Sequence, residues 1–434
     1  MRPISTATFT RLRALKLEIP PDPLGIARAL AAQGLEGIAL LASTEPSDQS
    51  FVAAQPDRRS SALDPLSEED EPRASGALTG APRWIGVVPY EARRTLERPG
   101  WVKPDTRPEP LLTLPEWWRY RAVVTIDHRS GEVLVVGDDA RAIDRLAKAA
   151  RARPHPARAV ELLLTDADPK EAHLERVARA RELILDGDLY QVNLARRIDV
   201  HVKTGAPLDV FARLSHAAPA EYAAYLSLGQ VEVLATSPEL LLHAAVGPDD
   251  CRFARLVTEP IKGTRPRGID AESDARLVQE LDGDEKERAE LAMIIDVERN
   301  DLARVCSTVR ITKPPAVVTH RTVHHRRARL AGWVRDGVSR VEVLEAMLPS
   351  GSVTGAPKVR AMEVIADLEA HRRGLYTGGY GYVGHDGSMT LAMAIRTLVL
   401  QGTRGHYFTG GGIVADSDPE RELQETGWKA LQLQ

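Results

Sequence analysis

Apolar side chains recur at helical spacing just after the first third of the chain. They occupy Leu174, Val177, Ala178, Ile184 and Leu185. Asp168-Pro169 is a helix-start signal and Gly187 is a stop signal, so a helix is predicted between them. The following residues alternate at the period of a strand, with Gln191 and Asn193 on the face opposite three apolar side chains. If the apolar face packs into a core, Gln191 points toward whatever lies on the other side.

Further segments alternate between strand-like and helix-like patterns without a repeating βαβ order. Strands are predicted at residues 84–88, 121–126, 132–136 and 230–236, and a turn at 127–131 joins the second to the third. Helices are predicted at 140–153, at 284–305 and after Ser417-Asp418-Pro419-Glu420, which is a strong start signal. This order favours an antiparallel-rich α+β fold over a Rossmann sheet.

Two polar segments divide the chain. Residues 47–83 are rich in Pro, Ser and acidic residues and are predicted to form a long exposed loop. Pro154 and Pro156 mark a seam, so we expect an N-terminal region over residues 1–165 and a C-terminal region over 166–434.

Composition is that of an ordinary globular protein. The 434 residues are 43% hydrophobic and 27% charged, with a net charge of −4, so no global attraction to nucleic acid or an anionic membrane is expected. No apolar run has the length of a transmembrane helix, and the basic N-terminus lacks a signal-peptide core. Cys251 and Cys306 have no metal-type spacing. The expected location is the cytoplasm.

The segment Glu259–Gly268 has two prolines and two glycines, which predicts a shaped loop. It carries Lys262, with Arg265 and Arg267 close behind. Nearby cations and burial are the usual means by which a lysine becomes a nucleophile. A basic surface loop without a ligand is the alternative.

Two acidic pairs lie three residues apart on predicted helices, where such spacing places both side chains on one face. These pairs are Glu287 with Glu290, and Glu422 with Glu425. Four carboxylates on two helices would suit Mg²⁺, which takes oxygen ligands and leaves positions open for a substrate. Ordinary solvated helix surface is the alternative.

Two glycine-rich segments are candidate anion sites. In the first, Ser350–Lys358, a glycine loop containing Thr354 and Gly355 leads through Pro357 into a helix, whose first N–H groups can hold a carboxylate or phosphate. The second is Gly410-Gly411-Gly412, which allows close approach to a ligand but is equally typical of a bulge or bend. Further donors could come from Tyr376, Arg396 and Lys429.

Together these residues resemble the chorismate-utilising enzymes, and within them most closely the component I of aminodeoxychorismate synthases. The resemblance is strong from about Asp168 to Lys429. The segments that carry it are Asp186–Leu194, Thr236–Glu239, Pro260–Thr264, Arg299–Asp301, Gly351–Lys358, Tyr376–Arg396 and Gly412–Glu420. It implies an antiparallel-rich β-sandwich surrounded by helices, with chorismate as the substrate and Mg²⁺ as the cofactor.

The resemblance also implies roles for individual residues. Glu290 and Glu425 would coordinate Mg²⁺, supported by Glu287 and Glu422, and the metal would hold the ring carboxylate. Thr354 and Gly355 would line the ring. The enolpyruvyl end of chorismate would be oriented by Tyr376, Arg396, Lys429 and the amides of Gly410, Gly411 and Gly412.

Two positions separate the reactions of this family. Where isochorismate and salicylate synthases carry a lysine base, this chain has Gln191, which cannot activate water. Anthranilate synthases carry alanine where this chain has Lys262. In aminodeoxychorismate synthases that lysine attacks C2, while Glu239 protonates the departing C4 hydroxyl and later takes a proton back.

The chain departs from the family pattern in two places. His325 matches a site histidine that anthranilate synthases use in pyruvate elimination, but Arg326 and Arg327 stand where apolar residues are usual. This predicts a more exposed strand; a basic edge strand is the alternative. Ala42 replaces the glutamate of a tryptophan-pocket motif, so feedback by tryptophan is not implied.

Ammonia is expected from a separate glutamine amidotransferase subunit, since neither cysteine lies in the glycine-rich setting of a glutaminase nucleophile. The function expected from Lys262 is conversion of chorismate and ammonia to 4-amino-4-deoxychorismate, for 4-aminobenzoate and folate synthesis. Anthranilate synthase component I is the alternative enzyme. A catalytically silent partner subunit is a third hypothesis, and the intact set of Lys262, Glu239 and the four glutamates argues against it.

Overall fold

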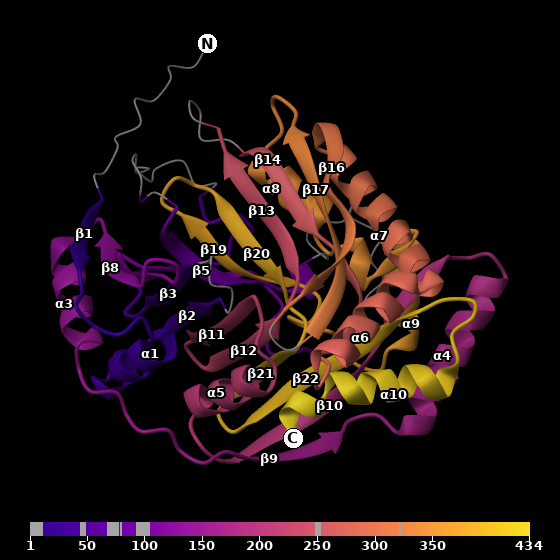
Figure 1. Ribbon diagram of the computed structural model, residues 1–434, viewed down its shortest axis with the longest axis horizontal. Coiled ribbons are helices and arrows are strands. Elements are labelled where there is room, and N and C mark those ends of the chain that lie inside the picture. The colour runs from indigo at the N-terminus through magenta and orange to yellow at the C-terminus, as the bar shows by residue number, and fades with distance from the viewer. Residues whose placement is uncertain are drawn as a thin grey trace.

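The computed structural model describes residues 12–43, 49–66, 78, 80–92, 105–247, 253–320 and 323–434. Two antiparallel sheets form the centre of the protein, and helices lie around them (Figure 1). The predicted antiparallel-rich α+β fold, a β-sandwich surrounded by helices, is confirmed.

Within the described residues, the first sheet has twelve strands. They are β1 (Arg13–Lys16), β2 (Ala39–Ala42), β3 (Gln49–Ala53), β7 (Ala122–Asp127), β8 (Glu132–Gly137), β9 (Glu161–Asp166), β10 (Gln191–Thr204), β11 (Tyr222–Leu228), β12 (Val231–Ser237), β18 (Gly355–Ala356), β21 (Thr397–Gln401) and β22 (Arg404–Ile413). Their order is β1-β8-β7-β3-β2-β11-β12-β21-β22-β10-β18, with β9 also paired to β10. The pair β10–β22 lies near the end of this order and carries much of the site.

The second sheet has ten strands in the part of the chain that the structure describes. They are β4 (Arg58–Ser60), β5 (Pro82–Val88), β6 (Glu116–Arg119), β13 (Leu240–Val246), β14 (Phe253–Glu259), β15 (Ile261–Pro266), β16 (Cys306–Thr319), β17 (Val323–Val334), β19 (Gly379–Gly384) and β20 (Met389–Met393). The order is β15-β17-β14-β13-β20-β19-β5-β6-β4, and β16 also pairs with β17. Both sheets contain strands from either side of residue 165, so the two sequence regions share their sheets.

Several helices begin at a residue whose side chain caps the first turn. The described helices are α1 (Pro23–Ala32), α3 (Ala140–Ala150), α4 (Lys170–Leu185), α5 (Pro207–Ala217), α6 (Ala271–Gly283), α7 (Glu285–Ala303), α8 (Arg340–Met347), α9 (Lys358–Leu368) and α10 (Pro419–Lys429), with single turns η1 (Tyr90–Ala92), η2 (Gly351–Val353) and η3 (Leu431–Leu433). The side chains of Asp284 and Asp418 accept hydrogen bonds from backbone N–H groups in the first turns of α7 and α10. None of the helices in the described ranges combines the length and apolar character needed to cross a bilayer.

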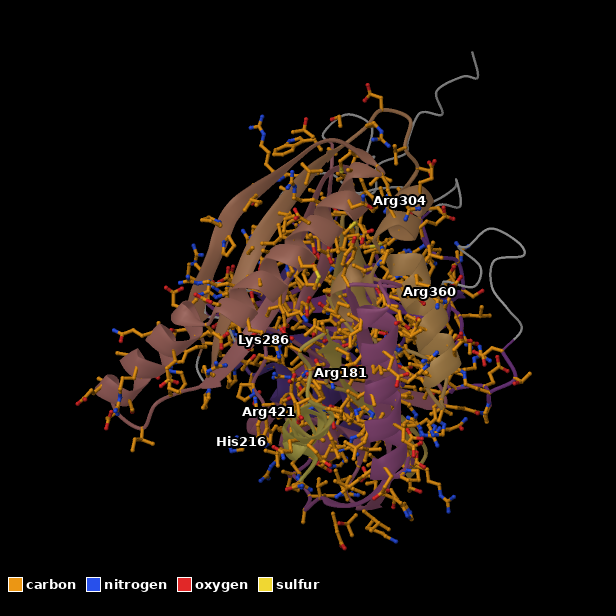
Figure 2. All side chains as sticks on the ribbon, turned by 90° about the vertical axis from the view of Figure 1, so that its right-hand side faces the viewer. Arg181, His216, Lys286, Arg304, Arg360 and Arg421 are labelled. Carbon is orange, nitrogen blue, oxygen red and sulfur yellow. The ribbon has the colours of Figure 1, made fainter. Side chains whose placement is uncertain are left out.

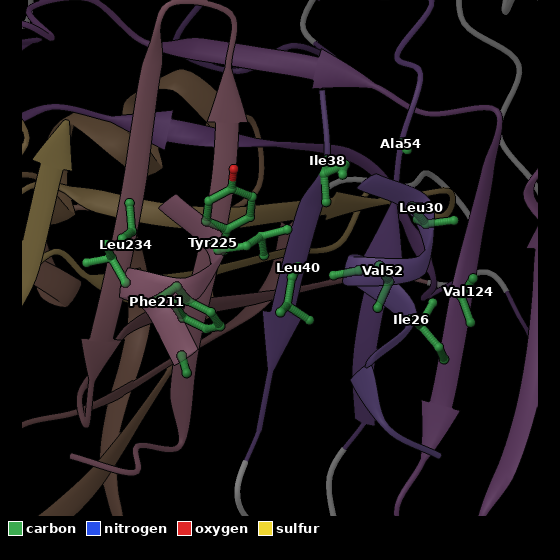
Figure 3. Close-up of a cluster of buried hydrophobic side chains, with 14 of the residues drawn as sticks. Ile26, Leu30, Ile38, Leu40, Val52, Ala54, Val124, Phe211, Tyr225 and Leu234 are labelled. Atoms are coloured by element: carbon green, nitrogen blue, oxygen red, sulfur yellow. The ribbon is translucent and has the colours of Figure 1, made fainter. Parts of the chain in front are cut away.

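A large apolar cluster holds the N-terminal helices against the first sheet. Figure 3 shows Ile26 and Leu30 of α1 facing Val52 and Val124 of the sheet. Phe211 of α5 closes the same cluster farther along the sheet. Full burial of each such side chain contributes about 1.5–3 kcal/mol to folding, so this cluster makes the N-terminal region part of one core.

Two predictions about loops are wrong. Residues 47–83 contain the strand β3, whose Phe51 and Val52 are buried, because a short apolar run lies within a polar segment. The acidic Glu68–Glu71 of that segment lies outside the described residues. The segment Glu259–Gly268 contains the strand β15, which among the described strands pairs with β17 alone. It tolerates its glycine because Gly263, at a φ of 77°, forms a bulge in the pairing with β17.

Asp168 does not cap α4 as the sequence suggested. The residue before α4 is Pro169, which provides no side-chain hydrogen bond. The carboxylate of Asp168 instead binds Arg176 at 3.3 Å and His371 at 3.2 Å.

Candidate active site

The three glycines of β22 lie in a regular antiparallel ladder and form no bend. Gly410, Gly411 and Gly412 pair with Ala195, Leu194 and Asn193 of β10. A side chain at Gly412 would place its Cβ 2.6 Å from the amide nitrogen of Gln191 and 3.3 Å from Nζ of Lys262. The missing side chains therefore let groups from both sheets meet over this strand.

The acidic pair of α10 lies beside the middle glycine. A Cβ at Gly411 would lie 3.1 Å from Oε2 of Glu422 and 3.8 Å from Oε1 of Glu425. Lys429, one turn further, is 2.7 Å from Glu425 and donates to the carbonyl oxygen of Gly410 at 2.8 Å. Although burial raises the pKa of Glu425, Lys429 outweighs it and the net pKa is lowered.

The second acidic pair projects from α7. Glu290 lies 3.7 Å from Lys262 and 3.8 Å from Lys286. Burial and the neighbouring Glu290 raise the pKa of Glu287, although Arg265 lies 3.8 Å away. Figure 2 views this side of the molecule, where Lys286 marks the start of α7 and Arg421 marks the start of α10.

The two pairs suit a hard cation in their donor chemistry. All four side chains offer carboxylate oxygens, and burial together with Glu425 raises the pKa of Glu422, as expected where like charges face each other. Among the described residues no three His, Cys, Asp or Glu side chains lie close enough to hold a metal ion together. Mg²⁺ is commonly bound through one or two carboxylates plus substrate and water. Glu290 and Glu425 are the candidates for these two carboxylates. Their negative charges are balanced by Lys262 and Lys429, respectively.

An aromatic side chain lies beside the first glycine, since a Cβ at Gly410 would be 2.9 Å from the hydroxyl of Tyr376. Tyr376 stacks on Phe408 of β22 with ring centroids 5.4 Å apart. The guanidinium of Arg396 forms no hydrogen bond or ion pair with any described side chain, and its backbone has a positive φ of 49°. A strained backbone that presents an unpaired cation is typical of a binding site.

His325 is buried on β17 and is neutral. Its Nδ1 lies 2.9 Å from the hydroxyl of Thr264 on β15. Burial, reinforced by the charges of Arg396 and His320, lowers the pKa of His325 to about 3. At neutral pH the imidazole therefore rests uncharged, with one ring nitrogen able to accept a hydrogen bond and the other able to donate one.

Both polar atoms of the Gln191 side-chain amide are buried and have no hydrogen-bond partner among the described residues. An unsatisfied buried polar group costs about 1–3 kcal/mol, and such groups gather where a ligand supplies the missing partner. The sequence predicted one apolar face packed in the core and one polar face on the other side of this strand. In the structure both faces of β10 are buried from Gln191 to Arg196.

The glycine loop before α9 packs against β10. Gly355, at a φ of 136°, pairs with Val192, and a side chain there would overlap the carbonyl of Gln191. Thr354 is fully buried and its hydroxyl donates to the carbonyl of Ser350 at 2.8 Å. The loop thus supports the strand that carries Gln191.

Glu239 follows β12 and is the best general-acid candidate. Burial, with help from the nearby Glu298, raises its pKa to about 8. Ser352 donates to its Oε1 at 3.1 Å. Glu298 was not among the predicted site residues, although it continues the buried face of α7 formed by Leu291 and Ile295. An acid at an apolar position of a helix is the signal that could have revealed it.

The two arginines near Lys262 are paired with other acids. Arg265 lies 3.0 Å from Asp284, and Arg267 lies 2.8 Å from Asp274. The partner of Lys262 is Glu290, so the cluster of free cations suggested by the sequence does not form.

The prediction that the strand of Arg326 and Arg327 is exposed is also wrong. It is β17, which lies between β14 and β15 with β16 also paired to it. Arg326 is buried against Asp282 at 2.7 Å, and Arg327 lies 2.9 Å from Glu221. Acidic partners allow both charges inside a central strand.

We expect Gly412→Ala to weaken substrate binding by about 10-fold or more, since each 1.4 kcal/mol of lost binding free energy is tenfold. The new methyl group would displace the amide of Gln191 and approach Lys262. The measurement is the KM for the substrate, compared with that of Gly427→Ala on α10, where a Cβ meets nothing within 4 Å. An unchanged KM would show that the glycine is not needed for close approach.

Comparisons with known proteins agree with this geometry. The chain matches the family described as chorismate binding enzyme over residues 30–434. It is 40% identical over 363 residues to the anthranilate synthase component 1 of Thermus thermophilus, covering 80% of this chain and 76% of that protein. It is 39% identical over 368 residues to the corresponding protein of Streptomyces coelicolor, covering 79% and 70%. The crystal structure of anthranilate synthase component I from Streptococcus pneumoniae superimposes with a TM-score of 0.73 at 26% identity, covering 100% of this chain and 94% of that one.

These relatives overturn one expectation from the sequence. Assignment to the aminodeoxychorismate synthases is wrong, because the similar proteins are named anthranilate synthase component 1 and match about four fifths of the chain. The assignment depended on Lys262, a single position. In the structure that ammonium pairs with Glu290, which is a role that requires no attack on a substrate.

Proposed function

The chain belongs to the family of chorismate-binding enzymes, and from this premise we propose that it is the synthase component of an anthranilate synthase. It would convert chorismate and ammonia to anthranilate, pyruvate and water. The similarity to relatives of that name supports the reaction, and the family match supports the substrate.

The observation that carries this proposal is the meeting of acidic, cationic and neutral polar groups over the glycines of β22. Lys429 and the unpaired Arg396 offer positive charge to a dianionic substrate, and the buried amide of Gln191 lacks a partner. Gln191 cannot act as a base toward water, so the site disfavours hydroxylation of the ring.

Glu239 is the acid of the proposed reaction. As ammonia adds at C2, the bond from C4 to its hydroxyl breaks and Glu239 donates the proton that makes the hydroxyl leave as water. The raised pKa keeps this carboxyl protonated near neutral pH. Neutral His325 is the candidate for the proton transfers that accompany loss of pyruvate.

Mg²⁺ would be held by Glu290 and Glu425, with Glu287 and Glu422 in support, and would bind the ring carboxylate when present. Tyr376 and Arg396 would orient the enolpyruvyl group, while Lys429 fixes Glu425 against the glycines.

A separate glutamine amidotransferase is the proposed source of ammonia, since the relatives are each named as one component. Cys306 is buried and burial raises its pKa to about 11, which does not suit a nucleophile. Cys251 lies outside the described residues.

Product analysis tests the proposal. The purified protein is incubated with chorismate, ammonium and Mg²⁺, and products are identified by mass and by anthranilate fluorescence. Equal amounts of anthranilate and pyruvate are expected. An aminated product that retains the enolpyruvyl group would overturn the proposal.

Lys262→Ala is expected to keep anthranilate formation within about tenfold of the unsubstituted protein, equivalent to about 1.4 kcal/mol in the barrier. The reason is that Lys262 serves as a counter-ion for Glu290, with Lys286 close by to share that role. Turnover with ammonia is the measurement, and Lys286→Ala is the matched variant. Complete loss of activity in a folded Lys262→Ala protein would contradict the counter-ion role.

A further inference from the structure

Two buried carboxyl groups are joined by two serine hydroxyls. The Oγ atoms of Ser350 and Ser352 lie 2.9 Å apart. At one end Ser352 is 3.1 Å from Oε1 of Glu239, and at the other Ser350 is 2.5 Å from Oε1 of Glu298. Glu239 is 6% exposed and Glu298 only 2%, so solvent does not interrupt the chain.

This arrangement comes from elements that are distant in sequence. Glu298 lies on α7, the serines open the turn η2, and Glu239 follows β12. Thr258, on β14, is 3.3 Å from the second oxygen of Glu298. The carboxyl of Glu298 is thus fixed from both sides and faces Glu239 through the serines.

A serine hydroxyl has one proton to donate and two lone pairs to accept, so the chain can run in either direction. With the proton on Glu239, each hydroxyl donates toward Glu298. With the proton on Glu298, each hydroxyl donates toward Glu239. Moving one proton along the chain reverses every hydrogen bond and leaves both serines neutral.

The surrounding charges favour one shared proton. Burial raises the pKa of Glu298, and the neighbouring Asp301 adds to the effect. Lys358 of α9 lies 2.7 Å from Asp301 and acts in the opposite direction. Burial and Glu298 raise the pKa of Glu239, which Lys262 of β15 opposes. Ionising both carboxyls would place two like charges in a buried site.

We propose that Glu298 is a positioning residue that shares one proton with Glu239 through the two serine hydroxyls. The inference rests on the proposed function in so far as Glu239 is the acid. As ammonia forms the bond to C2, Glu239 gives its proton to the leaving hydroxyl and water departs. The new ammonium then returns a proton to the Glu239 carboxylate, and exchange with Glu298 returns the pair to its shared state.

Glu298→Gln is the main test, because the amide keeps the shape and the hydrogen bond to Ser350 but holds no negative charge. Losing that charge lowers the pKa of Glu239, so the basic limb of the kcat profile should move to lower pH by about one unit. At pH values on the basic limb, kcat of Glu298→Gln should then be up to about tenfold lower than that of the unsubstituted protein. Near pH 6 the two kcat values should be similar. The KM for chorismate should stay the same.

Ser352→Ala provides a second test with the opposite sign. The hydroxyl of Ser352 lowers the pKa of Glu239, so its removal should move the basic limb to higher pH. If the substitutions merely loosened the site and admitted water, the basic limb would move to lower pH in both Glu298→Gln and Ser352→Ala. Asp296→Asn, an exposed carboxylate on the same helix, is the matched control and should leave the profile unchanged.

Infrared difference spectra give a readout that does not depend on turnover. The band of a protonated buried carboxyl should be present in the unsubstituted protein, lost in Glu239→Gln and shifted in Glu298→Gln. Superimposable pH profiles for Glu298→Gln and the unsubstituted protein, or equal shifts in Asp296→Asn, would overturn the proposal. If Glu298→Gln does not fold, an unmoved limb in Ser352→Ala would overturn it equally. Product identity, measured in the same assays, tests the proposed function separately.

Discussion

Glu425→Gln is expected to reduce kcat/KM for chorismate by about 100-fold or more at ordinary Mg²⁺ concentration. Even residues that only support a metal ligand cost about 10–100-fold in metal affinity or activity when replaced, and Glu425 is proposed as a direct ligand. Its carboxylate lies beside Gly411 and pairs with Lys429 at 2.7 Å. Glutamine keeps the shape but removes the charge that attracts the cation. Raising the Mg²⁺ concentration should restore part of the activity.

The matched control is Glu420→Gln, in the exposed first turn of the same helix. It changes the net charge equally but lies away from the glycines, so kcat/KM and the Mg²⁺ requirement should not change. Calorimetry of chorismate binding in EDTA and in Mg²⁺ adds a readout free of turnover. At ordinary concentration, Mg²⁺ should tighten chorismate binding to the unsubstituted protein and have much less effect on binding to Glu425→Gln. Near-normal turnover of Glu425→Gln would remove this residue from the metal site.

Helices were predictable because their signals are local. Asp284 and Asp418 cap the helices that the sequence placed there, and each cap fixes which acidic side chains share a face. The proposed metal ligands Glu290 and Glu425 could therefore be selected from spacing within one helix. Their proximity to a common strand could not, because it depends on how α7 and α10 pack.

Strands and buried polar networks were harder to predict. The segment of Lys262 contains Pro and Gly and reads as a loop, yet its pairing with β17 makes it a strand. The connection from Glu239 to Glu298 passes through residues more than 50 positions away, with no periodic signal. The predicted reaction was wrong for a related reason: it depended on Lys262 alone, and the pairing of this lysine with Glu290 is not visible in the sequence.

Arg373→Met is expected to lower the free energy of unfolding by about 3–5 kcal/mol, the usual cost of breaking a buried ion pair. Arg373 is buried and lies 2.6 Å from Glu369. It also donates to the carbonyl oxygens of Asn193 on β10, at 2.7 Å, and Val353 of η2, at 3.0 Å. Its loss would leave the buried Glu369 carboxylate without its counter-ion, although it would still accept the hydrogen bond from the backbone N–H of Ala195, and would loosen two segments that support the site.

Arg360→Met on α9 is the matched control. Arg360 pairs with Asp188 at 2.8 Å near the surface, where such a pair contributes about 0–1 kcal/mol (Figure 2). Urea unfolding of both variants gives the comparison. The double variant Arg373→Met with Glu369→Gln should be more stable than Arg373→Met alone, because the uncompensated charge is removed with its partner. The buried pair does not support this part of the fold if the free energy of unfolding of Arg373→Met lies within about 1 kcal/mol of that of the unsubstituted protein. The same conclusion follows if adding Glu369→Gln to Arg373→Met lowers the free energy of unfolding further.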